Sequence, residues 1–462
     1  MEFRCGHMNL RNHALPKKMD VDKAPLGLRI AFVYSRMPFP MMRGDQLTVA
    51  HLLSFLAARG HDVDFFTTDA DGDANDAQKA WLDDACRSVQ IYKHSVVARV
   101  FATLKGLLRG LPMQVGMFTV PELTRDIRKG IENGRFDVVY VYYLRSAEVI
   151  SKRMSSVKPG SNGGRNVTTF LAMQLSQTLN TKRIYDNERG LKKLLYWIEF
   201  VLLRRYEARV WQRFTRTVLI GPRDVEAIKD ECRQQQVREI DNWVYGAHGT
   251  DVGKFIPAQA SEVVPGRVVF SGSMLYTPNV QAILWFVEKC WPSIRSQVPG
   301  AELIVQGRDP VQDVRKLHGK DGVVVTGTVP DVGTMIRSAS VCINPMLAAG
   351  GMQNKLIEYL ASAKAVVATT VANEGIGATP GEHFLLADSA ADFSRGVLTL
   401  LADGVKREEL GRAARAFTMK NWTWEAHFME LERSFYSSVH DAGLDSQRAG
   451  RMVSSEHQFN VE

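Results

Sequence analysis

The chain has 462 residues, of which 45% are hydrophobic and 23% charged, a composition typical of folded globular proteins and unlike collagen or a disordered chain. Its length predicts two or three domains with buried cores. The formal net charge of +8 is a mild excess that suits nucleotides, nucleic acid or an anionic membrane surface without choosing among them.

The cysteines and the amino-terminal segment both favour a cytoplasmic protein. The five cysteines are odd in number, scattered and without a CxxC pair, which argues against a disulfide framework and against a zinc site. Residues 1–26 contain no apolar signal-peptide core, and no stretch approaches the ~18 apolar residues of a spanning helix. We therefore expect a disordered leader over 1–26 and no transmembrane anchor.

The first half alternates apolar runs with helical patterns. The run 28–35 ends in a loop with Pro and Gly, and a helical stretch follows over 47–59. Further apolar runs lie at 63–68, 136–143, 167–173 and 216–221. Because the intervening segments are long enough for crossover helices, the pattern predicts a parallel, doubly wound sheet.

A second series of apolar runs begins after Pro265. The runs are continuous in Val, Ile and Leu, which is typical of parallel strands that are buried on both faces. They lie at 267–273, 301–307, 323–329, 340–345, 365–371 and 383–387. Helical patterns fill the gaps, including one over 280–294.

We therefore predict an α/β protein with two doubly wound, Rossmann-like domains that face each other across a cleft. The expected boundaries are 27–250 for the first domain, 251–420 for the second, 421–442 for a C-terminal helix and 443–462 for a flexible tail. In open α/β sheets, ligands bind beyond the carboxyl ends of the strands, so a site is expected there.

Four carboxylates lie between Asp69 and Asp76, directly after a predicted strand. A calcium loop needs Gly at its sixth position and Glu at its twelfth, where this sequence has Ala74 and Ala80. A metal-binding DxD motif is the alternative, but clustered carboxylates are usually solvated. We interpret the segment as an acidic surface loop and predict no metal site.

Two strand-to-helix junctions could hold a phosphate. Gly44 closes the loop after the first strand, just before a helix, where free backbone N–H groups can face an anion. Gly272 and Ser273 follow a later strand, and Asn279 is suited to cap the next helix. An ordinary turn explains each junction equally well.

The most specific segment runs from Ala349 to Ala361. Gly350 and Gly351 let the backbone approach a ligand closely, and Lys355 brings a cation to the start of a helix. Glu358 lies one turn further on and can accept hydrogen bonds from two sugar hydroxyls. The alternative is an i, i+3 surface ion pair worth ~0.2 to 0.5 kcal/mol.

A set of motifs in the second half occurs in a recognisable order. They are Phe270–Met274 with Tyr276 and Pro278–Asn279, then Pro299–Arg308, Val325–Asp331, Gly351–Glu358 and Val367–Gly375. Over residues 265–437 they resemble the nucleotide-sugar-dependent glycosyltransferases of the GT-B fold, specifically family 4 of the retaining enzymes (glycosyltransferase group 1), in its bacterial polysaccharide-biosynthesis branch. The first half resembles the family more loosely, through the Gly44 loop, Tyr185–Asp186, Leu203–Glu207 and Tyr245–Asp251.

The resemblance implies a donor site on the second domain. Glu358 would hold the ribose hydroxyls, and Lys355 would bind the diphosphate and stabilise its charge as it leaves, which makes it the expected catalytic residue. The loop around Val329 would lie at the base, and Gly44 would approach the diphosphate from the opposite wall. The expected donor-binding residues are Gly44, Gly272, Ser273, Val329, Gly350, Gly351, Met352, Asn354 and Glu358.

One residue departs from the wider family. That family has a glutamate eight residues before the ribose glutamate, and this sequence has Gly350 there. Because the branch often lacks that acid, we expect an active enzyme. The alternatives are a non-catalytic nucleotide-sugar-binding subunit and a same-fold nucleotide-sugar epimerase or hydrolase.

The implied reaction moves a hexose or related sugar from a UDP- or GDP-linked donor to a growing, lipid-linked saccharide in exopolysaccharide or glycoconjugate biosynthesis. It retains the anomeric configuration and uses no cofactor or metal. No nucleic-acid partner is expected, because the basic residues are dispersed. Basic, apolar helices expected at 96–111 and 191–205 either lie on an anionic inner leaflet or pack within the domain.

Overall fold

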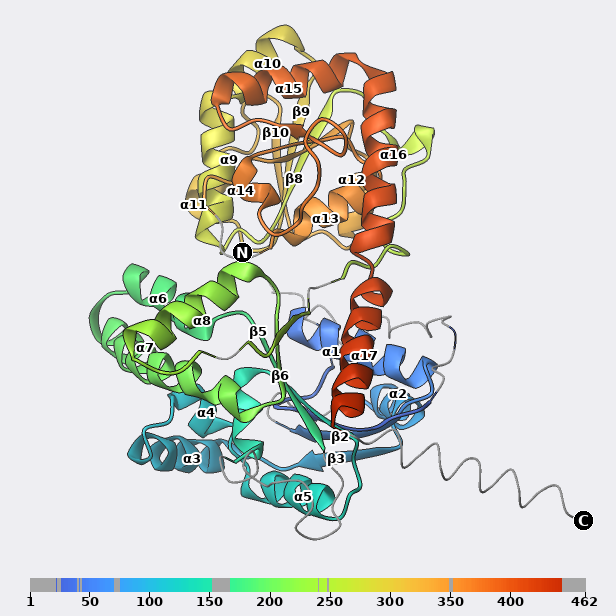
Figure 1. Cartoon of the computed structure of the whole chain (residues 1–462). Coiled ribbons are helices and arrows are strands. Elements are labelled where there is room, and N and C mark those ends of the chain that lie inside the picture. The colour runs from blue at the N-terminus through green and yellow to red at the C-terminus, as the bar shows by residue number, and fades with distance from the viewer. Residues whose placement is uncertain are drawn as a thin grey trace, which may run out of the picture. The chain divides into compact units, whose positions relative to one another are not determined.

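The computed structural model describes residues 22, 26–39, 41, 44–69, 75–151, 167–239, 241–246, 249–348 and 352–442. The chain divides into two compact units (Figure 1). Unit 1 comprises Met1–Ala247 and Phe428–Glu462, and unit 2 comprises His248–His427. The helix at the carboxyl end therefore belongs largely to the first unit.

Unit 1 is built on a seven-stranded parallel sheet with strand order β3-β2-β1-β4-β5-β6-β7. The strands are β1 (Arg29–Tyr34), β2 (Asp62–Thr68), β3 (Ser88–Tyr92), β4 (Val138–Tyr142), β5 (Thr168–Gln174), β6 (Arg216–Leu219) and β7 (Trp243–Tyr245). The central strands are buried almost throughout, as their continuous apolar sequences predict. The edge strands β3 and β7 escaped sequence-based prediction because they are short and only partly buried.

The helices of unit 1 alternate with these strands. They are α1 (Gly44–Ala58), α2 (Asp76–Ala85), α3 (Val96–Leu108), α4 (Met113–Met117), α5 (Pro121–Glu132), α6 (Gln177–Asn187), α7 (Gly190–Val210), α8 (Pro222–Gln234) and most of α17 (Trp424–Asp441). Two 3₁₀ turns, η1 (Leu144–Val149) and η2 (Trp211–Arg213), complete the unit.

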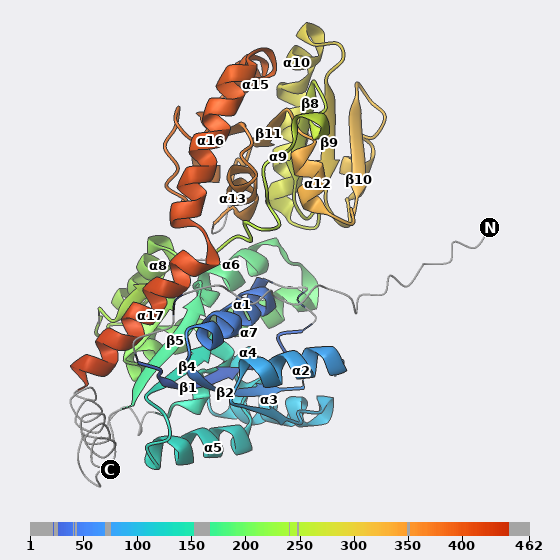
Figure 2. The same ribbon diagram turned by 90° about the vertical axis from the view of Figure 1, so that its right-hand side faces the viewer.

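Helix α17 returns to unit 1 from a distant part of the sequence. Figure 2 shows it alongside α1, and the rings of Phe428 and Phe55 are 5.5 Å apart. The ring of Phe435 meets that of Phe170 on β5 at 4.8 Å. Glu432 accepts a hydrogen bond from Arg59 at 2.9 Å, so both apolar and ionic contacts attach the helix.

Unit 2 is built on a six-stranded parallel sheet with strand order β10-β9-β8-β11-β12-β13. The strands are β8 (Arg267–Ser271), β9 (Glu302–Gln306), β10 (Val323–Gly327), β11 (Val341–Asn344), β12 (Val366–Ala368) and β13 (Leu385–Leu386). Each falls within an apolar run identified from the sequence.

The helices of unit 2 fill the gaps between its strands. They are α9 (Thr277–Lys289), α10 (Trp291–Gln297), α11 (Gln312–Arg315), α12 (Val332–Arg337), α13 (Asn354–Ala361), α14 (Thr370–Asn373), α15 (Ala390–Ala402) and α16 (Gly404–Asn421), with a 3₁₀ turn η3 (Ala260–Glu262). The single helix expected over 280–294 is wrong in extent: α9 ends before Cys290, and Pro292, which lacks an amide donor, stands in the first turn of α10.

The predicted α/β class with two doubly wound sheets is confirmed by these two parallel sheets and their crossover helices. In the described part of the chain, no helix combines the length and apolar character needed to cross a membrane.

Candidate functional site

Unit 2 contains a pocket of about 500 Å³ at the carboxyl end of its sheet. The loops that follow β8, β9 and β10 supply three sides, and the start of α13 supplies another. The lining residues are Lys254, Phe255, Ser271, Gly272, Ser273, Tyr276, Asn279, Gln306, Gly307, Arg308, Thr328, Val329, Val332, Met352, Gln353, Asn354, Lys355 and Glu358. Ligands of open parallel sheets bind at this edge.

Two glycines allow the loops after β8 and β9 to cross closely. A Cβ atom on Gly307 would lie 1.7 Å from the carbonyl oxygen of Gly272, far inside van der Waals contact. A Cβ atom on Gly272 would lie 2.6 Å from the side-chain nitrogen of Asn279 and 3.1 Å from Lys355 Nζ. The backbone can therefore take this path, beside the pocket's cation, only with glycine at both positions.

Lys355 lies in the first turn of α13 and is only 8% exposed. Its Nζ donates to Asn279 Oδ1 at 2.5 Å and lies 4.4 Å from the ring centroid of Phe270. Burial lowers the pKa of this amine to about 7, although the nearby Glu358 carboxylate opposes the shift. The site thus holds a desolvated amine that a bound anion would favour in its charged form.

Glu358 lies one turn after Lys355 on the same helix and is half-buried. Burial raises the pKa of its carboxyl group, while the positive charges of Lys254 and Lys355 act in the opposite direction. The next residue, Tyr359, accepts a hydrogen bond from the backbone N–H of Ser271 at 2.7 Å. This bond ties α13 to the end of β8 and so holds Glu358 beside the loop glycines.

Gln306 is a buried amide that faces the pocket from the end of β9. It is 1% exposed, and neither its Oε1 nor its Nε2 has a hydrogen-bond partner among the described residues. Buried amides are normally paired, so this side chain offers one acceptor and two donor hydrogens to a ligand or water. The sequence carried no signal for it, since an isolated glutamine at a strand end has no distinctive pattern.

A family model described as Glycosyl transferases group 1 matches residues 265–403, which include most of the pocket. This stretch is therefore similar to the glycosyltransferase domains that the model describes. The match ends well short of the whole chain, so it describes unit 2 only.

Relatives of the whole chain are more distant. An uncharacterized 44.6 kDa protein in the cps region of Klebsiella pneumoniae is 20% identical over 413 residues, covering 87% of this chain and 98% of that protein. The structure of sucrose-phosphate synthase from Thermosynechococcus elongatus has a TM-score of 0.57 at 15% identity, covering 89% of this chain and 98% of that one. Anabaena Alr3699/HepE in complex with UDP also has a TM-score of 0.57, at 12% identity, covering 89% and 100%. The likenesses to these two solved structures confirm the GT-B fold.

Seven of the residues predicted to bind the donor or act in catalysis line the pocket of unit 2. They are Gly272, Ser273, Val329, Met352, Asn354, Lys355 and Glu358. Gly44 is the exposed first residue of α1 in unit 1 and does not line this pocket. Gly350 and Gly351 lie outside the described residues.

Sequence reasoning assigned no role to Lys254 and Phe255, which also line the pocket. They follow a turn in which Asp251 Oδ1 accepts the backbone N–H groups of Gly253 and Lys254 at 2.9 and 3.0 Å. Asp251 ended a family-like motif, so the turn was detectable. That it delivers a lysine to this pocket depends on tertiary structure.

The acidic segment between Asp69 and Asp76 makes structural contacts where it is described. Asp69 Oδ1 accepts the backbone N–H of His94 at 2.6 Å, and Asn75 caps α2, while residues 70–74 lie outside the described part. Among described residues, no group of three or more His, Cys, Asp or Glu is placed to hold a metal ion.

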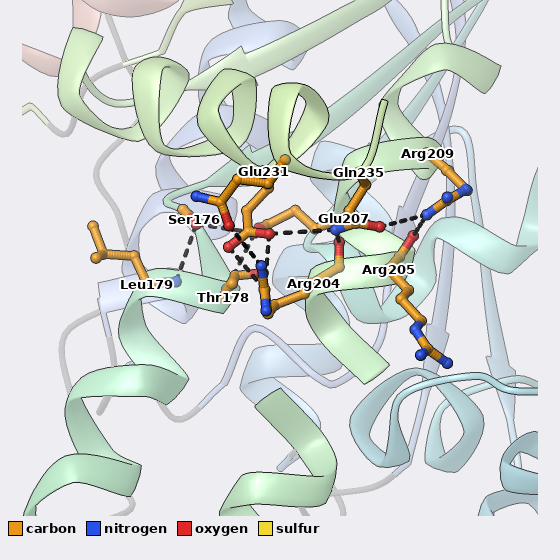
Figure 3. Close-up of polar contacts among 10 residues, drawn as sticks. Ser176, Thr178, Leu179, Arg204, Arg205, Glu207, Arg209, Glu231 and Gln235 are labelled. Atoms are coloured by element: carbon orange, nitrogen blue, oxygen red, sulfur yellow. Dashed lines mark hydrogen bonds and ion pairs between the residues drawn. The ribbon is translucent and has the colours of Figure 1, made fainter. Parts of the chain in front are cut away.

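The Leu203–Glu207 motif ends in a buried helix cap. The Glu207 carboxylate accepts the Ser176 hydroxyl at 2.9 Å and the backbone N–H groups of Gln177 and Thr178 at 2.7 and 3.1 Å, at the start of α6 (Figure 3). Burial raises its pKa to about 7 despite these donors. The motif therefore positions α6 against α7.

Proposed function

We propose that the protein is a glycosyltransferase that moves a sugar from a nucleoside-diphosphate sugar to a saccharide acceptor. The observation that carries the proposal is the pocket of unit 2, where a buried lysine and a half-buried glutamate meet glycine-rich loops. A nucleoside diphosphate presents the complementary groups, namely an anion and a pair of ribose hydroxyls.

In this proposal, Lys355 and the backbone amides near Gly272 and Ser273 bind the diphosphate, at the pocket edge where α9 begins. Glu358 accepts hydrogen bonds from the ribose. The loop around Val329, with the amide of Gln306, receives the nucleoside end. The Anabaena protein was solved with UDP and with UDP-glucose, which favours a uridine nucleotide and a hexose here.

The proposed reaction retains the anomeric configuration and needs no enzymic nucleophile. The leaving diphosphate stays beside the acceptor hydroxyl, and the charge of Lys355 stabilises it as the glycosidic bond breaks. The scheme assigns this task to the lysine alone and requires neither a metal ion nor a cofactor. Catalysis proceeds with Gly350 in place of the wider family's glutamate, because this scheme takes its charge stabilisation from Lys355.

The proposed acceptor is a lipid-linked saccharide in polysaccharide or glycoconjugate biosynthesis, met at the cytoplasmic face of the inner membrane. Support for the polysaccharide role comes from the Klebsiella relative in the cps region.

Nucleotide binding tests the proposal most directly. Calorimetry with UDP and GDP, without divalent metal, should show binding that weakens roughly 10- to 100-fold in Glu358→Ala and in Lys355→Ala, since each loses hydrogen bonds to a charged group. Lys420→Ala and Glu408→Ala, at exposed positions on α16, should bind like the wild type.

A folded protein that binds neither nucleotide would contradict the proposal. Product analysis with a UDP-sugar then separates transfer from epimerisation or hydrolysis, and turnover should fall on the order of 10²-fold in Lys355→Ala. Binding without turnover on any saccharide acceptor would instead support a non-catalytic subunit.

A further inference from the structure

Ten large apolar side chains stand exposed on two helices of unit 1. Phe101 is 67% exposed and Leu108 is 91% exposed on α3, while Leu191 is 74% exposed at the start of α7. The complete group is Val96, Val97, Val100, Phe101, Leu104 and Leu108 on α3 with Leu191, Leu194, Leu195 and Trp197 on α7. Soluble domains rarely leave so many apolar groups together in water, so the patch calls for a partner.

Internal contacts fix both helices with these side chains outward. The opposite face of α3 packs on α4 through Gly106 and Gly116, where an added Cβ on Gly106 would lie 2.7 Å from the Cα of Gly116. Glu199 of α7 accepts the backbone N–H groups of Met113 and Gln114 at 2.6 and 3.2 Å, which caps α4. Helix α4 thus joins α3 and α7, which Figure 1 shows on the same side of unit 1.

The charged residues within the two segments that carry these apolar groups are all basic. No acidic residue occurs from Lys93 to Pro121, and none occurs from Arg189 to Ile198. Basic residues are interspersed in both segments, at Lys93, Arg99, Lys105, Arg109, Arg189, Lys192 and Lys193. We call these basic residues and the ten apolar ones the basic apolar surface.

Both the apolar and the basic side chains of this surface suit binding to an anionic lipid bilayer. Apolar side chains of an interfacial helix enter the boundary between headgroups and acyl chains, and each nearby Lys or Arg adds roughly 1 kcal/mol of attraction to an anionic leaflet. Long basic side chains can reach the headgroups while their stems cover apolar surface. A second copy of this chain would bring the same positive charges against one another.

We propose that the basic apolar surface docks unit 1 on an anionic phospholipid bilayer, with Phe101, Leu108 and Leu191 entering the headgroup region. The docking itself is independent of donor chemistry. Only the role that we assign to the docking, which is to bring the enzyme to a lipid-linked acceptor, rests on the proposed function.

Vesicle co-sedimentation tests this docking. The wild type should bind vesicles that contain phosphatidylglycerol, bind pure phosphatidylcholine vesicles at least tenfold more weakly, and be released from the anionic vesicles by salt. The double variant Phe101→Glu/Leu108→Glu and the double variant Lys105→Glu/Lys192→Glu should each lose binding at least tenfold. Val405→Glu, at a position 69% exposed on α16, is the matched control and should bind normally.

UDP binding by the same variants separates this inference from the proposed function. Loss of vesicle binding with unchanged UDP affinity supports docking, while absence of UDP binding with intact vesicle binding overturns only the donor proposal. Docking is overturned if the wild type stays in the supernatant, or if the double variants sediment like the wild type. It is also overturned if ultracentrifugation shows a dimer that Phe101→Glu/Leu108→Glu dissociates while vesicle binding persists.

Discussion

Burial lowers the pKa of Lys355, so that its protonation depends on nearby charges. Its amine lies between the ring of Phe270, the amide of Asn279 and the sulfur of Met346, with Glu358 as the nearby opposite charge. In such surroundings the neutral form competes with the ammonium, which explains a pKa of about 7. The charge of this amine therefore changes near neutral pH.

This shift predicts a pH dependence of nucleotide binding. A diphosphate prefers the ammonium, so UDP affinity should fall as pH rises from 7 to 9, by up to tenfold per pH unit until the pKa of the complex is reached. Calorimetry at several pH values measures this slope. Lys355→Met keeps Glu358 but has no titrating amine, so its weaker binding should be nearly independent of pH. Equal slopes in both proteins would contradict a role for the lysine charge.

Gln306 illustrates the limit of reading single residues. Its position opposite Ser271 follows from the β8–β9 register. Its amide lacks a partner among the described residues because of the packing around the end of the strand. A glutamine that is exposed and one that is buried look identical in a sequence. The lysine and glutamate of α13 could be recognised from the sequence, because they follow a pair of glycines and are spaced one helical turn apart.

Helix α7 acts as a support for two other helices. Glu199 caps α4 and Glu207 caps α6, each by accepting backbone N–H groups that no intrahelical carbonyl can reach. Burial raises the pKa of both carboxyl groups. The family-like motif around Glu207 is therefore explained structurally, as the joint between α6 and α7.

The raised pKa of Glu207 predicts how stability changes with pH. The folded state binds this proton up to about pH 7 and the unfolded state only to about 4.5, so this residue's contribution to stability is full below 4.5 and is lost as pH rises to 7. The loss is at most ~1.4 kcal/mol per pH unit.

Urea unfolding from pH 4.5 to 8 measures this contribution by comparison with Glu207→Gln. The amide keeps one acceptor oxygen but does not titrate, so the free energy of unfolding of the variant should gain on that of the wild type as pH rises through this window. Glu226→Gln, at an exposed position on α8, serves as the control and should follow the wild type. A constant difference between Glu207→Gln and the wild type at all pH values would exclude the proposed titration.

At the scale of the whole molecule, the two proposals assign different ligands to different units. The pocket proposed to bind the donor lies within unit 2, whereas the basic apolar surface lies within unit 1. Hydrogen exchange can separate them in one protein. UDP should protect amides in 271–279, 306–308, 328–332 and 352–358, and phosphatidylglycerol vesicles should protect 96–109 and 190–198.

Each ligand serves as the control for the other in this experiment. Protection of 96–109 by UDP alone, or protection of the pocket loops by vesicles alone, would contradict the assignment of separate sites. Protection of both regions by both ligands would show that the sites are coupled.

The sequence by itself determined the α/β class and the two series of strands, and it singled out the glycine-rich motif that contains Lys355 and Glu358. It could do so because hydrophobic period, glycine placement and helix starts are local properties. Lys355, Glu358 and Gly272 were recognisable for that reason, and they line one pocket. The break before α10 and the edge strands β3 and β7 were missed, because local pattern is weak where an element is short or half-buried.

Only the tertiary structure decided which apolar helices are buried and which polar groups lack partners. The patterns at 96–111 and 191–205 fit a core face and an exposed face equally, since hydrophobic periodicity does not reveal what covers it. Long-range packing leaves α3 and the start of α7 exposed, buries Lys355 and places Lys254 and Gln306 beside it. These outcomes depend on contacts between distant segments, which no local window of sequence contains.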